Sequence, residues 1–197
     1  MPNEFKQGEH IYLVYDTQDE QRSVAARYLS DGLRRGERCL YVAESRAALE
    51  QFRISLRDEG IDAEAYVGSG ALIEKTSHEV HLLDGTFDCE RMLAVLNEAV
   101  ETALNDGFQG LRACGDMSWL LEDASGSDQV VAYEALLNQF FHGARGAGMC
   151  LYDRQRLPLE MIDHALATHS TAIVNGQHEV NPSYRPSSIA GRGVTSL

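Results

Sequence analysis

Three carboxylates stand in the loop where a nucleotide-binding protein would hold phosphate. They are Asp16, Asp19 and Glu20, and they follow the apolar run HIYLVY at residues 10–15. A phosphate cradle needs backbone N–H groups freed by glycine and a lysine that supplies positive charge. This loop has neither, and acids at a helix N-terminus themselves complement the helix dipole. We therefore expect the loop to reject a triphosphate.

The stretch GFQGLRACGDMSWLL at residues 107–121 places charged groups inside an apolar strand pattern. Alternation puts Arg112, Cys114 and Asp116 on one face of that strand. A buried arginine is costly unless it is paired, and its candidate partners are Glu134 in the following helix and Asp116 itself. One interpretation is a structural ion pair, Arg112 with Glu134, that fixes sheet and helix. The other is a charge at the floor of a ligand pocket.

Polar and aromatic residues also follow other expected strands. Asp116 falls where an ATPase would carry its magnesium-binding acid, and Trp119 could belong to the core or to a pocket wall. Tyr152 and Arg154 also lie at the carboxyl ends of the expected strands. Their alternative role is in helix capping and a surface turn. The candidate ligand-binding residues are Tyr15, Asp16, Arg112, Asp116, Trp119, Tyr152, Arg154 and His169.

No catalytic or metal-binding motif emerges from spacing. His78 and His81 are spaced like metal ligands, but no third ligand is close in sequence, so we expect no metal. Ser118 lacks the glycines of a nucleophile elbow. The four cysteines form no Cys-x-x-Cys pair, and apolar surroundings predict buried, reduced thiols. We expect no cofactor and no enzymatic activity.

Composition narrows the class of protein further. The chain has 197 residues, a net charge of −13 and 44% hydrophobic residues, so it can bury a core but repels DNA, RNA and anionic lipid. No apolar run approaches the ~20 residues that span a bilayer. The N-terminus lacks the apolar segment of a signal peptide. We therefore expect a cytoplasmic protein with no nucleic-acid or membrane partner.

The elements that must position these residues alternate between strand and helix. Apolar strand patterns lie at residues 10–15, 38–43, 63–67, 109–114 and 148–152. Helical patterns lie at residues 19–35, 46–59, 88–106, 128–143 and 158–169. Residues 171–180 have the pattern of a C-terminal hairpin around Asn175-Gly176. The alternation predicts an α/β fold, a three-layer, doubly wound, mostly parallel sheet whose functional groups lie beyond the carboxyl ends of its strands.

Several segments, in this order and spacing, resemble those of one known family. They are HIYLVY at 10–15, LSDGLRRGERCLYVAE at 29–44, GFQGLRACGDMSWLL at 107–121, YEALLN at 133–138, CLYD at 150–153, THSTAIVNG at 168–176 and NPSY at 181–184. Over residues 8–186 the chain is similar to the MEDS domain, a sensory domain of methanogen and methylotroph regulators. We expect 8–186 to form a single sensory domain, and 1–7 and 187–197 to be flexible termini.

The resemblance implies a fold like the RecA-like, circadian-clock-type ATPases, here without a P-loop. It also implies sensing of small molecules, beside a kinase or DNA-binding module. We therefore expect a non-enzymatic module that binds a small, partly apolar ligand and signals to a kinase or transcription regulator in trans, or to another copy of itself. Two alternatives are a divergent ATPase that uses Asp116 with magnesium, and a ligand-free scaffold for a kinase or anti-sigma-type regulator.

Overall fold

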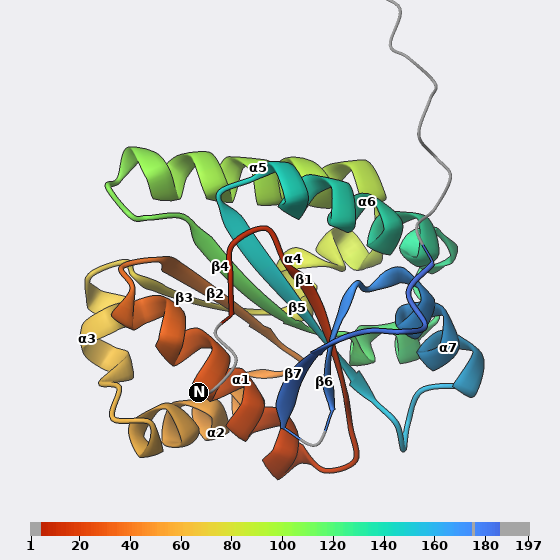
Figure 1. Cartoon of the computed structure of the whole chain (residues 1–197), viewed down its shortest axis with the longest axis horizontal. Coiled ribbons are helices and arrows are strands. Elements are labelled where there is room, and N and C mark those ends of the chain that lie inside the picture. The colour runs from red at the N-terminus through yellow and green to blue at the C-terminus, as the bar shows by residue number, and fades with distance from the viewer. Residues whose placement is uncertain (1–4, 175, 186–197) are drawn as a thin grey trace, which may run out of the picture.

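A seven-stranded sheet organises the chain (Figure 1). The computed structural model describes residues 5–174 and 176–185. The strands lie in the order β3-β2-β4-β5-β1-β6-β7, and all neighbours are parallel except the antiparallel β6–β7 hairpin. The predicted α/β class, the mostly parallel sheet and the C-terminal hairpin are confirmed. Asn175 and the segments 1–4 and 187–197 lie outside the described residues, whereas Phe5 is buried against Tyr28.

The elements have the following bounds. The strands are β1 (His10–Tyr15), β2 (Arg38–Ala43), β3 (Leu72–Thr76), β4 (Leu111–Asp116), β5 (Gly146–Asp153), β6 (Thr171–Val174) and β7 (Gln177–Val180). The α-helices are α1 (Gln18–Arg34), α2 (Arg46–Asp58), α3 (Ala63–Gly68), α4 (Ser77–Val80), α5 (Cys89–Asn105), α6 (Val130–Gly143) and α7 (Leu159–Thr168). Short 3₁₀ turns are η1 (Leu83–Gly85), η2 (Ser118–Glu122) and η3 (Ser127–Gln129).

One predicted strand is wrong. Residues 63–67 form α3, because Asp62 caps the segment by accepting a hydrogen bond from the Ala65 N–H at 3.2 Å, and Ala-Glu-Ala then favours a helix. The strand next to β2 is instead β3, which pairs Leu72 with Cys39. The sequence pattern does not mark this strand, LIEKT, because Glu74 and Lys75 interrupt the apolar run.

The two faces of the sheet carry separate cores, because side chains alternate along each strand. On β1, Leu13 and Tyr15 pack on the side of α1 and α2, whereas Tyr12 and Val14 pack on the side of α5, α6 and α7. Figure 1 shows α5 and α6 over one face and α1 and α2 over the other. Whether two residues can meet therefore depends first on which face each one occupies.

Helix α6 approaches β5 closely because residue 148 is glycine. A Cβ at Gly148 would lie 2.3 Å from the Phe141 ring, so the ring of Phe141 takes the space that a side chain would fill. The same ring stacks on His10 with centroids 5.8 Å apart. Glu134 lies two turns before Phe141 on the same side of α6, and this close approach carries it down toward β1 and β5.

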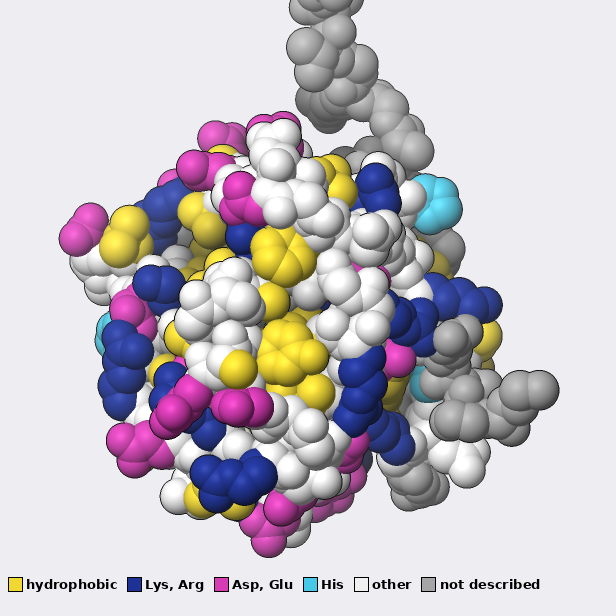
Figure 2. All heavy atoms as spheres, turned by 90° about the vertical axis from the view of Figure 1, so that its left-hand side faces the viewer, with side chains coloured by type: hydrophobic (Ala, Val, Ile, Leu, Met, Phe, Trp, Pro, Cys, Tyr) yellow, Lys and Arg dark blue, Asp and Glu magenta, His cyan; other side chains and the backbone are white. Residues whose placement is uncertain are grey.

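No helix in the described part of the chain combines the length and apolarity needed to cross a membrane. Figure 2 shows acidic and basic side chains interspersed over one face of the molecule, with apolar side chains among them. Neither observation tests the cytoplasmic location, which stays a prediction.

Candidate functional site

A cavity of about 330 Å³ lies between α6, α7 and the segment that follows β4. Its walls are largely apolar and include Leu120, Val130, Met161 and Ala165. Its exposed rim carries polar residues such as Asp128, Glu160 and His164. Glu134 and Tyr152 also line it, and each is at least 97% buried, so they form its floor.

Four elements bring polar groups together beneath this floor. Alternation along β5 points Cys150 and Tyr152 toward α6, which presents Glu134 one turn after Val130. His10 opens β1, whose pairing with β5 sets it opposite Gly148. His169 follows α7 directly and precedes β6, the other neighbour of β1.

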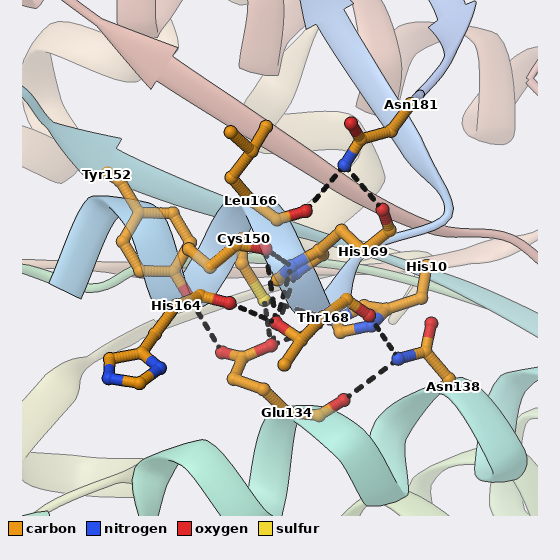
Figure 3. Close-up of polar contacts among 11 residues, drawn as sticks. His10, Glu134, Asn138, Cys150, Tyr152, His164, Leu166, Thr168, His169 and Asn181 are labelled. Atoms are coloured by element: carbon orange, nitrogen blue, oxygen red, sulfur yellow. Dashed lines mark hydrogen bonds and ion pairs between the residues drawn. The ribbon is translucent and has the colours of Figure 1, made fainter. Parts of the chain in front are cut away.

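The carboxylate of Glu134 is the centre of this cluster (Figure 3). Its Oε1 accepts a hydrogen bond from the Tyr152 hydroxyl at 2.8 Å. Its Oε2 faces His169 Nε2 at 3.1 Å, His10 Nε2 at 3.3 Å and Cys150 Sγ at 3.8 Å. We call His10, Glu134, Cys150 and His169 the buried cluster. All four residues are at least 92% buried.

Further hydrogen bonds fix the segments that carry the cluster. The Nδ1–H of His169 donates to the Ala165 carbonyl at 2.8 Å. The Asn181 amide donates to the carbonyls of Leu166, at 2.6 Å, and of His169, at 2.7 Å. The Asn138 amide donates to the Thr168 carbonyl, which joins α6 to the end of α7. The backbone around His169 is therefore held from both sides.

Charge in the cluster is concentrated on Glu134. Burial would raise the pKa of this carboxyl, but His169 and His10 outweigh it and hold the pKa well below its usual range. Burial, together with His169, lowers the pKa of His10 to about 4. Burial, and then the Glu134 charge, raise the pKa of the Cys150 thiol and of the Tyr152 hydroxyl. At neutral pH Glu134 is thus a carboxylate, and Cys150 without a further partner keeps its proton.

This arrangement can do two things chemically. The carboxylate at the floor can accept a hydrogen bond from a polar group inside an otherwise apolar cavity. The four donor atoms of the buried cluster, which lie within 4.8 Å of one another, are also of types that hold metal ions. A raised thiol pKa is the opposite of what a cysteine nucleophile needs.

The predicted pair between Arg112 and Glu134 is wrong. Arg112 is fully buried, and its Nε donates to Glu37 Oε2 at 2.5 Å while its Nη1 lies 3.2 Å from Asp31 Oδ2. It also lies over the Tyr28 ring, 4.8 Å from the centroid. The physical reason is the face: Arg112 points to the α1 side of the sheet, whereas α6 covers the other. Arg112 lies near the amino end of β4 and away from the cavity just described.

Two of the other candidates meet at the carboxyl edge. The Tyr15 hydroxyl donates to Asp116 Oδ2 at 3.2 Å, and the Gln21 amide donates to the same oxygen at 3.3 Å. The other oxygen accepts from the Ser118 N–H at 2.8 Å, and Asp116 is 3% exposed. Both oxygens of the Asp116 carboxylate are therefore engaged by neighbouring groups.

The remaining candidates are dispersed. Asp16 and Arg154 form an exposed ion pair at 3.2 Å. Trp119 is 1% exposed and stacks between His81 and Phe87, which places it in the core. Of the eight residues predicted to bind ligand, Tyr152 lines the cavity and His169 lies beneath it.

The loop after β1 is filled by its own side chains. Thr17 caps α1 by accepting from the Glu20 N–H at 3.2 Å, and the Glu20 carboxylate accepts from the Asp16 N–H at 3.0 Å. The Gln155 amide also donates to Asp16. The backbone N–H groups of Asp16 and Glu20, which could otherwise bind a phosphate, already donate to side chains of the same loop.

Sequence reasoning missed His10 and Cys150 and gave Glu134 the wrong partner. Both residues stand in apolar strand patterns, HIYLVY and MCLYD, which predict buried strands but no polar contact between them. Their shared signal is a polar side chain on the same alternating face of two strands. That signal becomes visible only once β1 and β5 are known to be neighbours.

The comparisons agree with this architecture. The family model named MEDS, described as MEthanogen/methylotroph, DcmR Sensory domain, matches residues 9–170. The KaiC-like protein PH0186 from Pyrococcus horikoshii OT3 superimposes with a TM-score of 0.59 at 14% identity, over 85% of this chain and 71% of that one. The flagellar accessory protein FlaH from Methanocaldococcus jannaschii gives 0.59 and 14%, over 93% and 83%. Among curated proteins, none matches significantly.

Proposed function

The chain belongs to the MEDS family, and from this premise we propose that it is a non-enzymatic sensory module whose ligand binds in the cavity between α6 and α7. The ligand is small and partly apolar, and the signal passes to a separate protein such as a kinase or a transcription regulator. The observation that carries the proposal is the Glu134 carboxylate, held by Tyr152 at the floor of an apolar cavity.

The cavity restricts the chemistry of the ligand. A volume of about 330 Å³ is at the small end of ligand pockets, which suits a molecule smaller than a typical drug. Apolar walls favour an alkyl or halogenated part. The charge of Glu134 at the floor and the acids Asp128 and Glu160 at the rim disfavour an anion. We therefore propose a neutral or cationic ligand with a hydrogen-bond donor, such as a short alcohol or alkylamine.

The position of the cavity offers a route for the signal. Helix α7 forms one wall through Met161 and Ala165, and it leads directly into His169 and the β6–β7 hairpin. A ligand that separates α7 from α6 would also move the segment that Asn181 holds to the end of α7. The hairpin is thus the part of the chain that we expect to report occupancy to a partner.

A thermal-shift screen with short alcohols, alkylamines and halogenated hydrocarbons tests this function. We expect at least one class to raise the midpoint of unfolding, because binding to the folded state alone stabilises it. Ala165→Leu, which fills the cavity, abolishes the shift, whereas the matched Ala167→Leu on the same helix leaves it intact. The absence of any shift, or an equal shift in both variants, contradicts the site.

The nucleotide-binding alternative is a second arm of the same screen. It predicts stabilisation by ATP with magnesium that disappears in Asp116→Ala. We expect no such stabilisation, because neighbouring side chains occupy Asp116 and the β1–α1 loop.

A further inference from the structure

The donor atoms of the buried cluster are spaced like the corners of a coordination polyhedron. A tetrahedral zinc site with bonds of about 2.0–2.3 Å has edges of about 3.3–3.7 Å between donor atoms. Here His169 Nε2 to Glu134 Oε2 is 3.1 Å, and His10 Nε2 to the same oxygen is 3.3 Å. Cys150 Sγ lies 3.5 Å from His10 Nε2 and 3.8 Å from Glu134 Oε2. All four atoms lie within 4.8 Å of one another, so the atoms that are farther apart must move closer by about 1 Å to surround one ion.

The hydrogen bond at Nδ1 of His169 determines which ring nitrogen carries the proton. A carbonyl can only accept, so the contact with Ala165 places a proton on Nδ1 of His169. In a neutral ring, Nε2 then carries a lone pair that points at a carboxylate oxygen 3.1 Å away. Within the described residues, Nε2 has no hydrogen-bond partner other than this carboxylate. Two electron pairs face one another unless a cation, a metal ion or a proton, lies between them.

The surroundings match what metal ligands usually have. A metal-binding histidine commonly donates its second N–H to a backbone carbonyl, and a ligating carboxylate is commonly hydrogen-bonded in turn. His169 has the first feature through Ala165, and Glu134 has the second through Tyr152. Because the partners are already in place, the ring and the carboxylate are oriented without a metal.

Charge balance also fits a divalent ion. A buried charge is expensive unless it is compensated. A divalent cation with one carboxylate, one thiolate and two neutral imidazoles has a net charge of zero. The cation itself removes the proton from a coordinating thiol, so Cys150 would coordinate as a thiolate.

We propose that His10, Glu134, Cys150 and His169 bind a divalent transition-metal ion, and that zinc is the preferred ion. Two nitrogens, one sulfur and one oxygen in a compact set suit tetrahedral zinc. The site joins β1, β5, α6 and the end of α7 beneath the cavity. The inference stands on the cluster alone and does not require the sensory ligand.

Metal analysis of the full chain, purified without a histidine tag, gives the direct test. We expect about one zinc ion per chain. We expect Cys150→Ala and His169→Gln to lose it. The matched controls are Cys114→Ala, another buried cysteine, and His81→Phe, another buried histidine, and both should keep it. Ala165→Leu should also keep the metal, which separates this result from a failure of ligand binding.

Cobalt titration keeps the proposal testable if a variant folds poorly. Wild-type protein, reduced and stripped with a chelator, should bind Co²⁺ and develop a thiolate charge-transfer band. Cys114→Ala should show the same band, and Cys150→Ala should lack it. If stripped wild-type protein binds neither Zn²⁺ nor Co²⁺, a proton bridges His169 and Glu134, and the proposal is overturned. Binding that survives in both Cys150→Ala and His169→Gln overturns it equally.

Discussion

The Tyr152 hydroxyl holds one oxygen of Glu134 at 2.8 Å, which leaves the other oxygen to His10, Cys150 and His169. This division of one carboxylate between a cavity floor and a buried cluster links the two sites proposed above. Tyr152 reaches the carboxylate from β5, so the orientation of Glu134 is set by the sheet as well as by its own helix.

Replacing Tyr152 by phenylalanine tests that orientation. A hydrogen bond to a charged group contributes roughly 1.5–3 kcal/mol, so we expect Tyr152→Phe to reduce the free energy of unfolding in urea by that amount. We also expect metal affinity to fall about 10- to 100-fold, as for other outer partners of a ligand. Tyr12→Phe, a neighbouring tyrosine on β1, is the control and should stay within about 0.5 kcal/mol of wild type.

The Arg112 ion pairs predict strong energetic coupling between Arg112 and Glu37, and none between Arg112 and Glu134. Arg112→Met leaves Glu37 buried without its cation, and we expect a loss of about 3–5 kcal/mol in unfolding free energy. The double variant with Glu37→Gln should recover part of that loss. A double-mutant cycle with Glu134→Gln should give additive effects, because the two residues lie on opposite faces of the sheet. Strong coupling to Glu134 would contradict the arrangement.

His81 predicts a loss of stability in mild acid. Burial lowers its pKa from 6.5 to about 4. Between these values the unfolded chain binds a proton that the folded chain does not, so stability falls as pH falls. The full effect is about 3 kcal/mol. His81→Phe keeps the stack on Trp119 and should remove this share of the pH dependence, measured as the difference between the two stability profiles. Parallel profiles would show that His81 does not titrate in this window.

The close contact between Gly148 and the Phe141 ring predicts that a larger residue at position 148 is destabilising, and that a smaller residue at position 141 relieves the clash. An added Cβ would lie 2.3 Å from the Phe141 ring, so we expect Gly148→Ala to lower the unfolding free energy by about 1–3 kcal/mol or more. The second substitution Phe141→Leu should relieve part of the penalty. The control is Gly143→Ala at the end of α6, the helix that carries Phe141, where an added Cβ would have nothing within 4 Å. We expect it to be neutral or slightly stabilising.

The sequence predicts those elements of the fold that depend on residues close together in the chain. Strands 10–15 and 38–43 have the predicted bounds because uninterrupted apolar runs mark strands buried on both faces. The strand at 63–67 failed because a capping aspartate and helix-forming residues outweighed two apolar side chains. In the loop after β1, Thr17 caps α1 and Glu20 accepts from the Asp16 N–H, which are contacts between near neighbours in sequence. The rejection of a triphosphate stays a prediction.

The site required information that local pattern does not hold. Alternation placed Arg112 on the correct face with Cys114, but only the topology shows that α1 covers this face. The buried cluster draws one residue each from β1, β5, α6 and the segment between α7 and β6, and the order of strands decides that His10 and Cys150 are neighbours. Spacing in sequence suggested His78 and His81 as a pair, yet His78 is exposed beside Glu122 and His81 stacks on Trp119.

The buried cluster also has a consequence for how the chain folds. His10 and His169 stand 159 positions apart (169 − 10), and their rings lie 3.9 Å apart between centroids. Closing so long a loop is entropically unfavourable until the intervening strands have paired. The cluster should therefore form after the rate-limiting step, and substitutions in it should speed unfolding while leaving the folding rate nearly unchanged. In kinetic terms, these four residues keep the assembled sheet from opening more than they help it to assemble.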